Sequence, residues 1–568
     1  MKRCIILLCA CLLLSTASAR AVSISSLDCE DARGDATKPP AHPGTTTALQ
    51  GEGAAESVVV DVFLLGGQSN AAGRGAVSEV PDPSILQNTR VMLYHSPQLN
   101  SGEPARTWIT LKPASSSAGF FGPEIGFGNR MAELYPDRQI AIIKHAVGGT
   151  DLAANWNPGV NADDTTSFGP QFRIFVDTVD AGISDLIAQG YAPVVRGMLW
   201  QQGERDSRNA SYGPAYPRNL SHFIKRVREQ FGVPNMPFVY GQVLPVVLTG
   251  YDYRDAIRQG QFDVDQDSGT VYATDGARLV LADDLGMNSD NLHVSAAGQI
   301  ALGTRFADAI GSVVVTGAFD FDGDGRIACA DVCAMLDHWH KNEPAYDVVP
   351  PLFGDGLVDV QDLTALAEFI GKDLRLLAHW PLDEENGSIA QDHARGSDGT
   401  LWGEPHWQPD SGLVDGALEL DGIDDHVDTP LVRSPSDEPF TIFVWVTGGE
   451  PGQAVVSQAD GTNWLMLNPE DGTVMTELKG AGRGGHPLTS DVSISDGDWH
   501  QVGLLWDGLN RVLYVDGIEV ARDTQVTMEP ASGGIRIGAG SDLQTGSFWA
   551  GLIDDIRIYD RPVLPEEQ

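Results

Sequence analysis

Strand-like and helix-like segments alternate along the first half of this chain, and this alternation limits its folds more than any other feature. The mostly apolar runs typical of buried parallel strands are 58–65, 139–144, 194–200 and 238–243. The helix-like stretches are 125–134, 174–189, 216–231 and 296–313. Strands separated by helices in this way form a parallel sheet. The sequence therefore predicts an α/β domain over residues 57–315.

The pattern changes after Gly317. Residues 318–372 contain two similar loop–helix units, and residues 374–565 are rich in Gly, Trp and turns, with short alternating segments. The latter pattern is typical of an all-β sandwich or jelly roll. At 568 residues the chain exceeds the roughly 250–300 residues that one hydrophobic core supports. We therefore expect three domains.

The N-terminus is typical of an export signal. Met1 precedes two basic residues, and the apolar run 4–14 is too short to span a bilayer. We expect a signal peptide over 1–21, a linker rich in Pro, Gly, Thr and Ala over 22–56, and a secreted protein (extracellular or periplasmic) without a membrane span. The formal net charge of -41 argues against nucleic acid as a partner, because phosphate binding needs clustered Lys and Arg.

Three of the six cysteines, Cys29, Cys329 and Cys333, lie beyond the predicted signal peptide. They are too few for a disulfide framework. Cys329 and Cys333 are four residues apart, and we interpret them as small apolar side chains on one helix face rather than as a bridge or a metal site.

A candidate nucleophile lies at the end of the first predicted strand, in the segment 66–70 (Gly-Gly-Gln-Ser-Asn). Reactive groups of open α/β sheets collect at the carboxyl ends of strands. Ser69 would open the next helix, whose N-terminus stabilises developing negative charge. The alternative is a helix N-cap, a common role of serine.

A candidate base lies shortly before the last predicted helix of this domain. Asp290 precedes His293 by three residues. A carboxylate there can accept the Nδ1 proton and leave Nε2 free to take a proton from a serine hydroxyl. The alternative is a histidine in a polar loop, but of the four histidines of this domain only His293 has an Asp at this spacing.

Two further turns follow predicted strands. The segment 200–206 (Trp-Gln-Gln-Gly-Glu-Arg-Asp) contains Gln202, whose amide can donate to an oxyanion. The segment 146–150 (Ala-Val-Gly-Gly-Thr) offers backbone N–H groups as a second donor. Each alone is weak, because glycine after a strand is usually only a turn.

Together these residues resemble the SGNH hydrolases, and within them the sialate O-acetylesterase-like acetylesterases, which include acetylxylan esterases of carbohydrate esterase family six. The residues that carry the resemblance, in the order and spacing of that family, are Gly67, Gln68, Ser69, Asn70, Gly148, Gly149, Thr150, Trp200, Gln202, Gly203, Glu204, Asp290 and His293. The Gly122-Pro123-Glu124 turn also matches. The resemblance implies a flavodoxin-like parallel sheet.

By this resemblance Ser69 is the nucleophile, His293 the base and Asp290 its orienting carboxylate. It further implies an oxyanion hole made by the Ser69 N–H, a backbone N–H of Gly148 or Gly149, and the side chain of Gln202. It implies supporting roles for Gln68, Asn70 and Glu204, with Glu204 an alternative to Asp290 as partner of His293. The implied reaction is two-step acyl transfer that frees acetate from an acetylated oligo- or polysaccharide, without a catalytic metal or other cofactor.

Residues 320–331 have carboxylates at positions 1, 3, 5 and 12 of a calcium-type loop, with Gly at position 6. The expected ligands are Asp320, Asp322, Asp324, the carbonyl of Arg326, and Asp331. This loop resembles a dockerin-type repeat. In a second copy ending at Asp362, positions 1 and 3 fall on Pro351 and Phe353. We expect a structural Ca²⁺ here, with a further one in the jelly roll left open. The module is either a spacer or an attachment domain for a cohesin-type or cell-surface partner.

Residues 374–565 resemble laminin G-like, concanavalin A-like jelly rolls. The segments that match are 379–383, 417–422, 499–500, 514–517 and 553–559. They correspond to core strands, so we expect Trp380, Trp445 and Trp499 in the core, and sugar binding by this domain is a hypothesis.

Two rival functions remain open. The first is a non-catalytic extracellular carbohydrate-binding or adhesion protein whose first domain has lost activity. The second is an SGNH lipase or thioesterase, which needs a long apolar acyl pocket.

Overall fold

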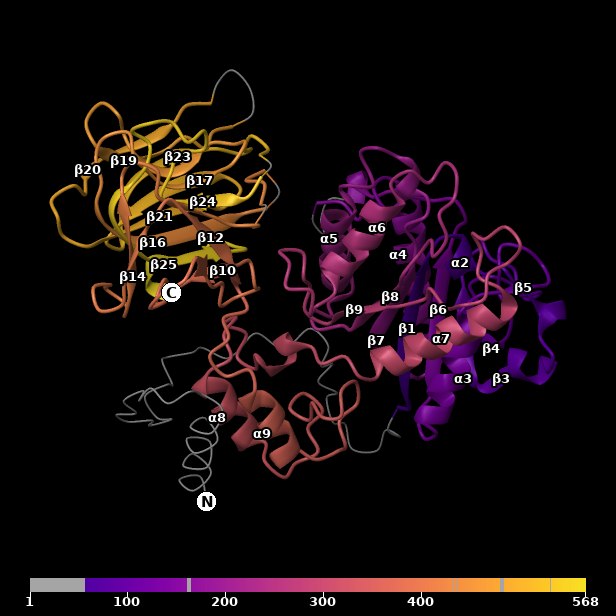
Figure 1. Cartoon of the computed structure of the whole chain (residues 1–568). Coiled ribbons are helices and arrows are strands. Elements are labelled where there is room, and N and C mark those ends of the chain that lie inside the picture. Colours follow the sequence, from indigo (N-terminus) through magenta and orange to yellow (C-terminus); the bar gives the residue numbers. More distant parts are fainter. Residues whose placement is uncertain (1–56, 161–164, 432, 437, 481–484, 532) are drawn as a thin grey trace. The chain divides into compact units, whose positions relative to one another are not determined.

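The computed structural model describes residues 57–568 except 161–164, 432, 437, 481–484 and 532. The predicted signal peptide (1–21) and linker (22–56) lie outside the described residues. The chain divides into two compact units (Figure 1). Of the described residues, one unit contains those up to Ser268 together with 272–371, and the other contains 269–271 and those from 372 to 568. The predicted calcium-loop module falls within the first unit.

The first unit contains a sheet with the strand order β4-β3-β6-β1-β7-β8-β9. Its strands are β1 (Val59–Gly67), β3 (Asn88–His95), β4 (Ile109–Leu111), β6 (Ile140–Ala146), β7 (Ala192–Gln201), β8 (Phe238–Gly241) and β9 (Ala277–Val280). All neighbours are parallel except β3 and β4. The four predicted strands correspond to β1, β6, β7 and β8, which confirms the α/β prediction; β3, β4 and β9 were not predicted. A short hairpin pairs β2 (Gly75–Ala76) with β5 (Phe120–Phe121).

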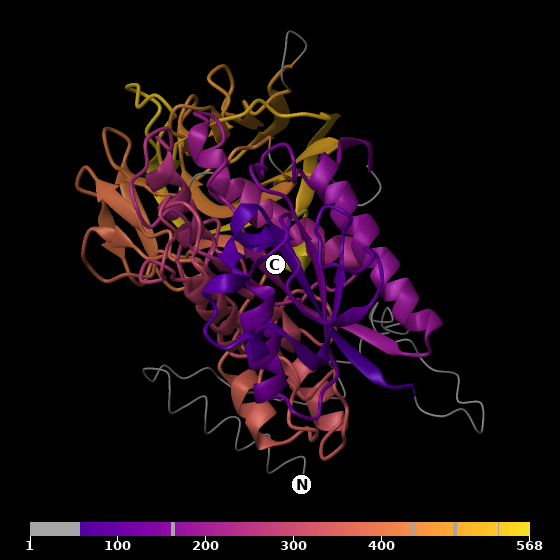
Figure 2. The ribbon, with the colours of Figure 1, turned by 90° about the vertical axis from the view of Figure 1, so that its right-hand side faces the viewer.

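Helices lie on both sides of this sheet (Figures 1 and 2). On one face pack α3 (Glu124–Leu134) and α7 (Ala296–Ile310). On the other pack α4 (Pro170–Ala188), α5 (Tyr216–Phe231) and α6 (Arg254–Val264). Side chains alternate along β1, so that Phe63 faces the first helix layer and Leu64 the second. Both faces of the central strand are therefore buried, as its continuous apolar sequence predicts.

The central strand β1 brings three turns to one edge of the sheet. β1 pairs with β6 on one side and β7 on the other, with Gly67 opposite both Ala146 and Gln201. The turns after these strands, which begin at Gln68, Val147 and Gln202, therefore leave the sheet at the same level. The carboxyl edge of a parallel sheet is where ligands bind in such folds.

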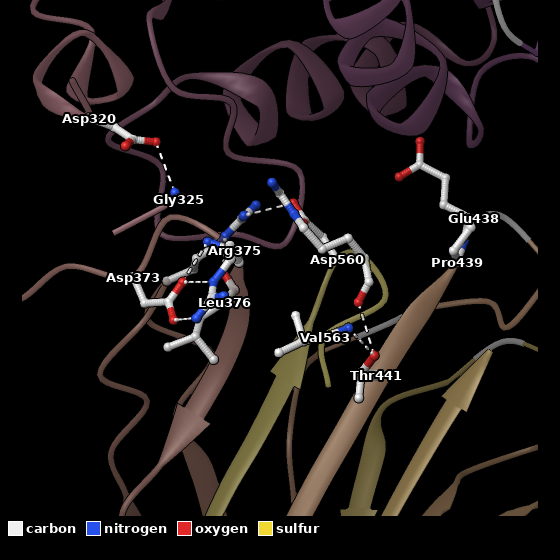
Figure 3. Close-up of polar contacts among 12 residues, drawn as sticks. Asp320, Gly325, Asp373, Arg375, Leu376, Glu438, Pro439, Thr441, Asp560 and Val563 are labelled. Carbon is white, nitrogen blue, oxygen red and sulfur yellow. Dashed lines mark hydrogen bonds and ion pairs between the residues drawn. The ribbon is translucent and has the colours of Figure 1, made fainter. Parts of the chain in front are cut away.

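The calcium-loop module has two helices, α8 (Cys329–Asp337) and α9 (Val360–Ala367). In the first loop the Asp320 carboxylate accepts the N–H group of Gly325 (Figure 3). It also accepts the N–H group of Gly323. The Asp331 carboxylate closes the loop by accepting the N–H groups of Phe321 and Ala328. Asp320 and Asp331 therefore join the two ends of this loop through backbone hydrogen bonds, and calcium binding stays a prediction.

The second loop corrects the alignment based on fixed spacing. Asp347, not Pro351, takes the place of Asp320, because its carboxylate accepts the N–H groups of Asp355 and Gly356. Asp362 accepts the N–H groups of Val348 and Asp359, as Asp331 does in the first loop. Asp347 stands eight residues before Asp355, whereas Asp320 stands four before Asp324. The second loop therefore contains a four-residue insertion.

The insertion brings Phe353 against the α/β sheet domain. The Phe353 ring lies 4.6 Å from the Tyr135 ring, edge to face. The Arg138 guanidinium lies 4.1 Å from the centre of the Phe353 ring. A residue first assigned to an ion-ligand position is therefore a packing residue.

The cysteine prediction was wrong in part. Cys333 is disulfide-bonded, whereas Cys329 is a free, exposed thiol at the start of α8. The four-residue spacing of Cys329 and Cys333 could not predict the disulfide bond of Cys333, because that bond does not involve Cys329.

The second unit is a sandwich of two eight-stranded sheets. The first sheet has the order β13-β14-β25-β16-β21-β22-β23, with β10 paired to β25, and the second β11-β12-β15-β24-β17-β18-β19-β20. The strands are β10 (Leu376–Trp380), β11 (Ile389–Ala390), β12 (Gly399–Trp402), β13 (His406–Gln408), β14 (Ala417–Asp421), β15 (His426–Asp428), β16 (Phe440–Gly448), β17 (Ala454–Gln458), β18 (Asn463–Leu467), β19 (Thr473–Thr476), β20 (Leu488–Ser493), β21 (His500–Trp506), β22 (Asn510–Val515), β23 (Ile518–Thr524), β24 (Ile535–Ile537) and β25 (Ala550–Tyr559). The all-β prediction is confirmed.

The sandwich core contains aromatic side chains from both sheets. Trp380 and Trp464 are fully buried in one cluster. Trp445 and Trp499 are only partly buried, which corrects their assignment to the core. At the entry to β10, the Asp373 carboxylate accepts two hydrogen bonds from the Arg375 guanidinium (Figure 3).

Candidate active site

Ser69 lies on a sharp turn between β1 and the short helix α2 (Ser69–Ala72). Gly67 has φ +134, and a Cβ there would lie 2.2 Å from the Gln201 carbonyl oxygen, so only glycine fits. Gln68, not Ser69, occupies the N-cap position, and the Gln68 side chain makes no capping hydrogen bond. The N-cap alternative for Ser69 is therefore not what the structure shows. Ser69 instead faces a cavity of about 220 Å³.

The His293 ring connects Ser69 to Asp290. His293 Nε2 lies 3.1 Å from Ser69 Oγ, and His293 Nδ1 lies 2.6 Å from an Asp290 carboxylate oxygen. The other Asp290 oxygen accepts the N–H groups of Leu292 and His293. Partial burial raises the pKa of Asp290, but these hydrogen bonds outweigh it and lower that pKa overall. Asp290 is therefore a charged partner for the imidazole across the neutral pH range.

The Asn70 side chain holds the loop that carries His293. Its amide donates to the Leu292 carbonyl at 3.2 Å, and its oxygen accepts the Val294 N–H at 3.0 Å. The two bonds flank His293 on both sides. Because Asn70 follows Ser69 directly, this clamp fixes the distance between the serine hydroxyl and the imidazole.

The turn that contains Gly148 and Gly149 lies beside Ser69 at the cavity. Gly148 and Gly149 line the cavity beside Ser69, and a Cβ on Gly148 would lie 3.4 Å from Ser69 Cβ. The Val147 N–H donates to the Gly67 carbonyl at 3.1 Å, which fixes this turn against the serine turn. Backbone donors held in this way stabilise a tetrahedral oxyanion without reorganisation. The geometry suits acyl transfer through a serine ester.

Comparison with known proteins agrees with this geometry. Residues 59–312 match the family model described as "Carbohydrate esterase, sialic acid-specific acetylesterase". Over 261 residues the chain is 25% identical to the probable carbohydrate esterase At4g34215 of Arabidopsis thaliana, covering 44% of this chain and 89% of that protein. The first unit carries a sialate acetylesterase-like carbohydrate esterase domain.

The esterase domain is followed by a second recognised domain. Residues 421–567 match the concanavalin A-like lectin/glucanase superfamily model Laminin_G_3. Two solved structures are also similar. That of the Arabidopsis thaliana protein has a TM-score of 0.35 at 22% identity, covering 44% of this chain and 97% of its own. That of XAC1771, a carbohydrate acetylesterase from Xanthomonas citri, has a TM-score of 0.33 at 13% identity, covering 87% of this chain and 78% of its own.

Gln202 does not reach the cavity of the esterase domain, contrary to the predicted oxyanion role. Its side chain is fully buried, and its amide nitrogen donates to the Thr150 carbonyl at 3.1 Å and to Asp206 at 2.5 Å. Both N–H groups are thus used inside the protein. The Tyr216 hydroxyl donates to the backbone carbonyl and to the side-chain oxygen of Gln202. Gln202 therefore connects the Thr150 turn to the Asp206 turn beneath the site.

Glu204 supports Asn70 and does not contact His293. Glu204 Oε1 accepts the Asn70 side-chain N–H at 2.7 Å. Its other oxygen is buried without a hydrogen-bond partner among the described residues. The structure therefore favours Asp290 as the partner of His293. Gln68 also has a supporting place, since its side-chain oxygen accepts the Arg205 N–H at 3.1 Å.

Burial raises the pKa of Glu204 to about 7, against the opposing hydrogen bond from Asn70. A carboxyl with a raised folded pKa costs stability as pH rises from its ordinary value of 4.5 through 7, because the unfolded chain ionises first. We expect Glu204→Gln to be more stable than the wild type at pH 8, on the order of 1–3 kcal/mol, and no more stable at pH 4. Denaturant unfolding at both pH values measures this. Parallel stability curves for the two proteins would contradict it.

Several residues of the cavity were not predicted from sequence. They are Arg74, Arg205, Arg208, Tyr251 and Leu292. Arg205 follows the Gln202–Glu204 motif directly, and this proximity is the sequence signal that could have predicted its place in the cavity. Tyr251 comes from a loop with no motif, and only the tertiary structure places it here.

In the part of the chain that the structure describes, two groups of carboxylates could hold a metal ion. Ligand oxygens of Asp320, Asp322 and Asp324 lie within 4.8 Å of one another, and so do those of Asp421, Asp424 and Asp425 in the sandwich. The first group contains three of the predicted calcium ligands. Among the described residues, none of the helices combines the length and the apolar character that crossing a bilayer requires.

Proposed function

We propose that this protein is an exported carbohydrate O-acetylesterase that works through a Ser69–His293–Asp290 triad. The observation that carries the proposal is the chain of contacts from Ser69 Oγ to His293 Nε2 and from His293 Nδ1 to Asp290. The match of the domain to a carbohydrate esterase family supports the substrate class. The export signal rests on the N-terminal sequence pattern alone.

In the first half-reaction Ser69 Oγ attacks the carbonyl carbon of the acetyl ester, and its proton moves to His293 Nε2. The carbonyl oxygen becomes an oxyanion, which the backbone N–H groups of Ser69 and of Gly148 or Gly149 stabilise. The C–O bond to the sugar then breaks, and His293 gives its proton to the departing sugar alkoxide. The product is an acetyl-Ser69 ester and a free hydroxyl on the sugar.

In the second half-reaction a water molecule replaces the sugar. His293 Nε2 takes a proton from the water as its oxygen attacks the acetyl carbon. The intermediate collapses, acetate leaves, and His293 returns the proton to Ser69 Oγ. Throughout, the Nδ1–H group of His293 donates a hydrogen bond to Asp290, which keeps the imidazole in the tautomer that can act as base.

The test is acetate release by the purified chain from acetylated saccharides, combined with labelling by a fluorophosphonate probe. We expect release, and probe adduct on the peptide that contains Ser69. Acetate release without any adduct on that peptide would contradict the serine mechanism. Neither release nor adduct would favour the non-catalytic binding protein, and preference for long acyl chains would favour the lipase or thioesterase.

We further propose that Asp320, Asp322 and Asp324 bind Ca²⁺, with Asp331 and the Arg326 carbonyl as the remaining ligands. Three converging carboxylates with a backbone cradle suit a hard cation that takes six to eight oxygen ligands. Since calcium would bind the folded loop, we expect chelation to lower the Tm by about 5 °C or more. The double variant Asp322→Asn/Asp324→Asn should lose that response. An unchanged Tm after chelation, with no binding in calorimetry, would refute this site.

A further inference from the structure

The charged side chains that line the cavity beside Ser69 are mainly positive, although the protein as a whole is acidic. Three arginines line it, Arg74, Arg205 and Arg208, together with His293 of the triad. The only carboxylate in its lining is Glu204, which is buried, bonded to Asn70 and has a pKa raised to about 7 by burial. The chain as a whole carries a formal net charge of -41. A cationic cavity in so acidic a chain concentrates anions near the nucleophile.

Within the part of the chain that the structure describes, these arginines have no ion-pair partner. Arg74 donates only to Ser117 Oγ, at 3.4 Å, and its Nε is buried without an acceptor. Other arginines of the same domain are paired with carboxylates, such as Arg258 with Asp283. A guanidinium presents five N–H donors in a fork that matches a carboxylate or a sulfate, so unpaired ones in a cavity indicate an external anion.

Two of the three arginines are placed to bind that anion. Arg205 and Arg208 are exposed at the cavity, on the turn that follows β7. The backbone N–H of Arg205 donates to the side chain of Gln68, the residue before Ser69, and this fixes the turn that carries the arginine. The Arg208 guanidinium lies 5.3 Å from the centre of the Tyr251 ring, which also lines the cavity. This contact restricts the orientations that the Arg208 side chain can adopt. Arg74 is less open and lies next to the Gly148 turn.

We propose that the acetylated substrate carries an anionic group, a carboxylate or a sulfate, which Arg205 and Arg208 bind while Ser69 attacks the acetyl ester. This inference rests on the proposed esterase function and narrows its substrate. According to this inference, the enzyme acts on acetylated acidic sugars in preference to neutral acetylated polymers. The two arginines bind substrate and take no part in the proton transfers.

The test compares kcat/KM on three acetylated substrates: a neutral xylo-oligosaccharide, a sialic acid and a sulfated galactan oligosaccharide. The wild type should prefer an acidic substrate, and the preference should weaken as NaCl rises, since salt screens exposed charges. Arg205→Gln/Arg208→Gln should lower kcat/KM on that substrate about 10-fold or more, mainly through KM, and change the neutral substrate less than about twofold. Whether the sialic acid or the galactan responds more distinguishes a carboxylate from a sulfate.

The control is Arg130→Gln, which changes a partly exposed arginine of α3 that is paired with Asp308 and Glu133 outside the cavity. It should leave all three rates unchanged. Equal losses by the double variant on neutral and acidic substrates would overturn this inference, and so would a wild-type preference for the neutral one. Both results leave the esterase function intact, because Ser69 still releases acetate. No release from any substrate, with no probe adduct on Ser69, would instead refute the esterase function and this inference together.

Discussion

Ser69→Ala should lower acetate release by about 10⁴-fold or more, because it removes the atom that forms the acyl-enzyme bond. The side chain is only 6% exposed and contacts His293, so alanine removes one oxygen and leaves the surrounding backbone in place. The Tm should therefore change little. Initial rates of acetate release, with excess enzyme for the slow variant, measure the effect.

The matched control for this variant is Ser84→Ala, a change at an exposed serine in a 3₁₀ turn away from the cavity. It should keep the wild-type rate. Mass spectrometry adds a second readout, because only a protein with Ser69 should gain the mass of an acetyl group when the reaction is quenched early. Substantial acetate release by Ser69→Ala would show that another group is the nucleophile.

Asp290→Asn should lower kcat by about 10³–10⁴-fold while the protein stays folded. The asparagine oxygen can still accept the N–H groups of Leu292 and His293, so the loop is kept. Its NH₂ group would then face His293 Nδ1, which favours the tautomer with the proton on Nε2. That imidazole cannot take the proton of Ser69, so the loss should appear in kcat rather than in KM.

Two other variants make this result specific. Asp284→Asn changes an exposed aspartate paired with Arg305 outside the cavity, and it should leave kcat unchanged. Glu204→Gln can keep its acceptor bond to Asn70 and should cost far less than Asp290→Asn. If Glu204→Gln instead costs as much as or more than Asp290→Asn, then Glu204 is the carboxylate on which the histidine depends.

The sequence alone was enough to predict the strands and the turns from which the triad residues come. β1, β6 and the second half of β7 are mostly apolar runs buried on both faces, and such runs are recognisable without knowledge of their neighbours. Asp290 and His293 are three residues apart in one loop, so their contact is local and follows from spacing. The contact between His293 and Ser69 spans 224 residues. The sequence predicted it only through the resemblance to a family.

Two of the wrong predictions concern contacts that residue spacing does not determine. Gln202 has the amide that an oxyanion hole needs, but both of its N–H groups donate inside the protein, to Asp206 and to the Thr150 carbonyl. In the second calcium-type loop, a fixed spacing put Pro351 at the first ligand position, whereas an insertion moves that role to Asp347. A local pattern cannot show which of several nearby partners a polar side chain meets after folding.

What the sequence by itself determined is therefore the order of the secondary structure and the chemistry available at each turn, since both depend on residues close together in the chain. Only the tertiary structure decided which turns meet. The pairing of β1 with β6 and β7 brings Ser69 to the Gly148 turn. The Asn70 clamp brings His293 to Ser69, and the same packing leaves Arg205 and Arg208 at the cavity without an ion-pair partner among the described residues. These outcomes depend on packing between segments far apart in the chain.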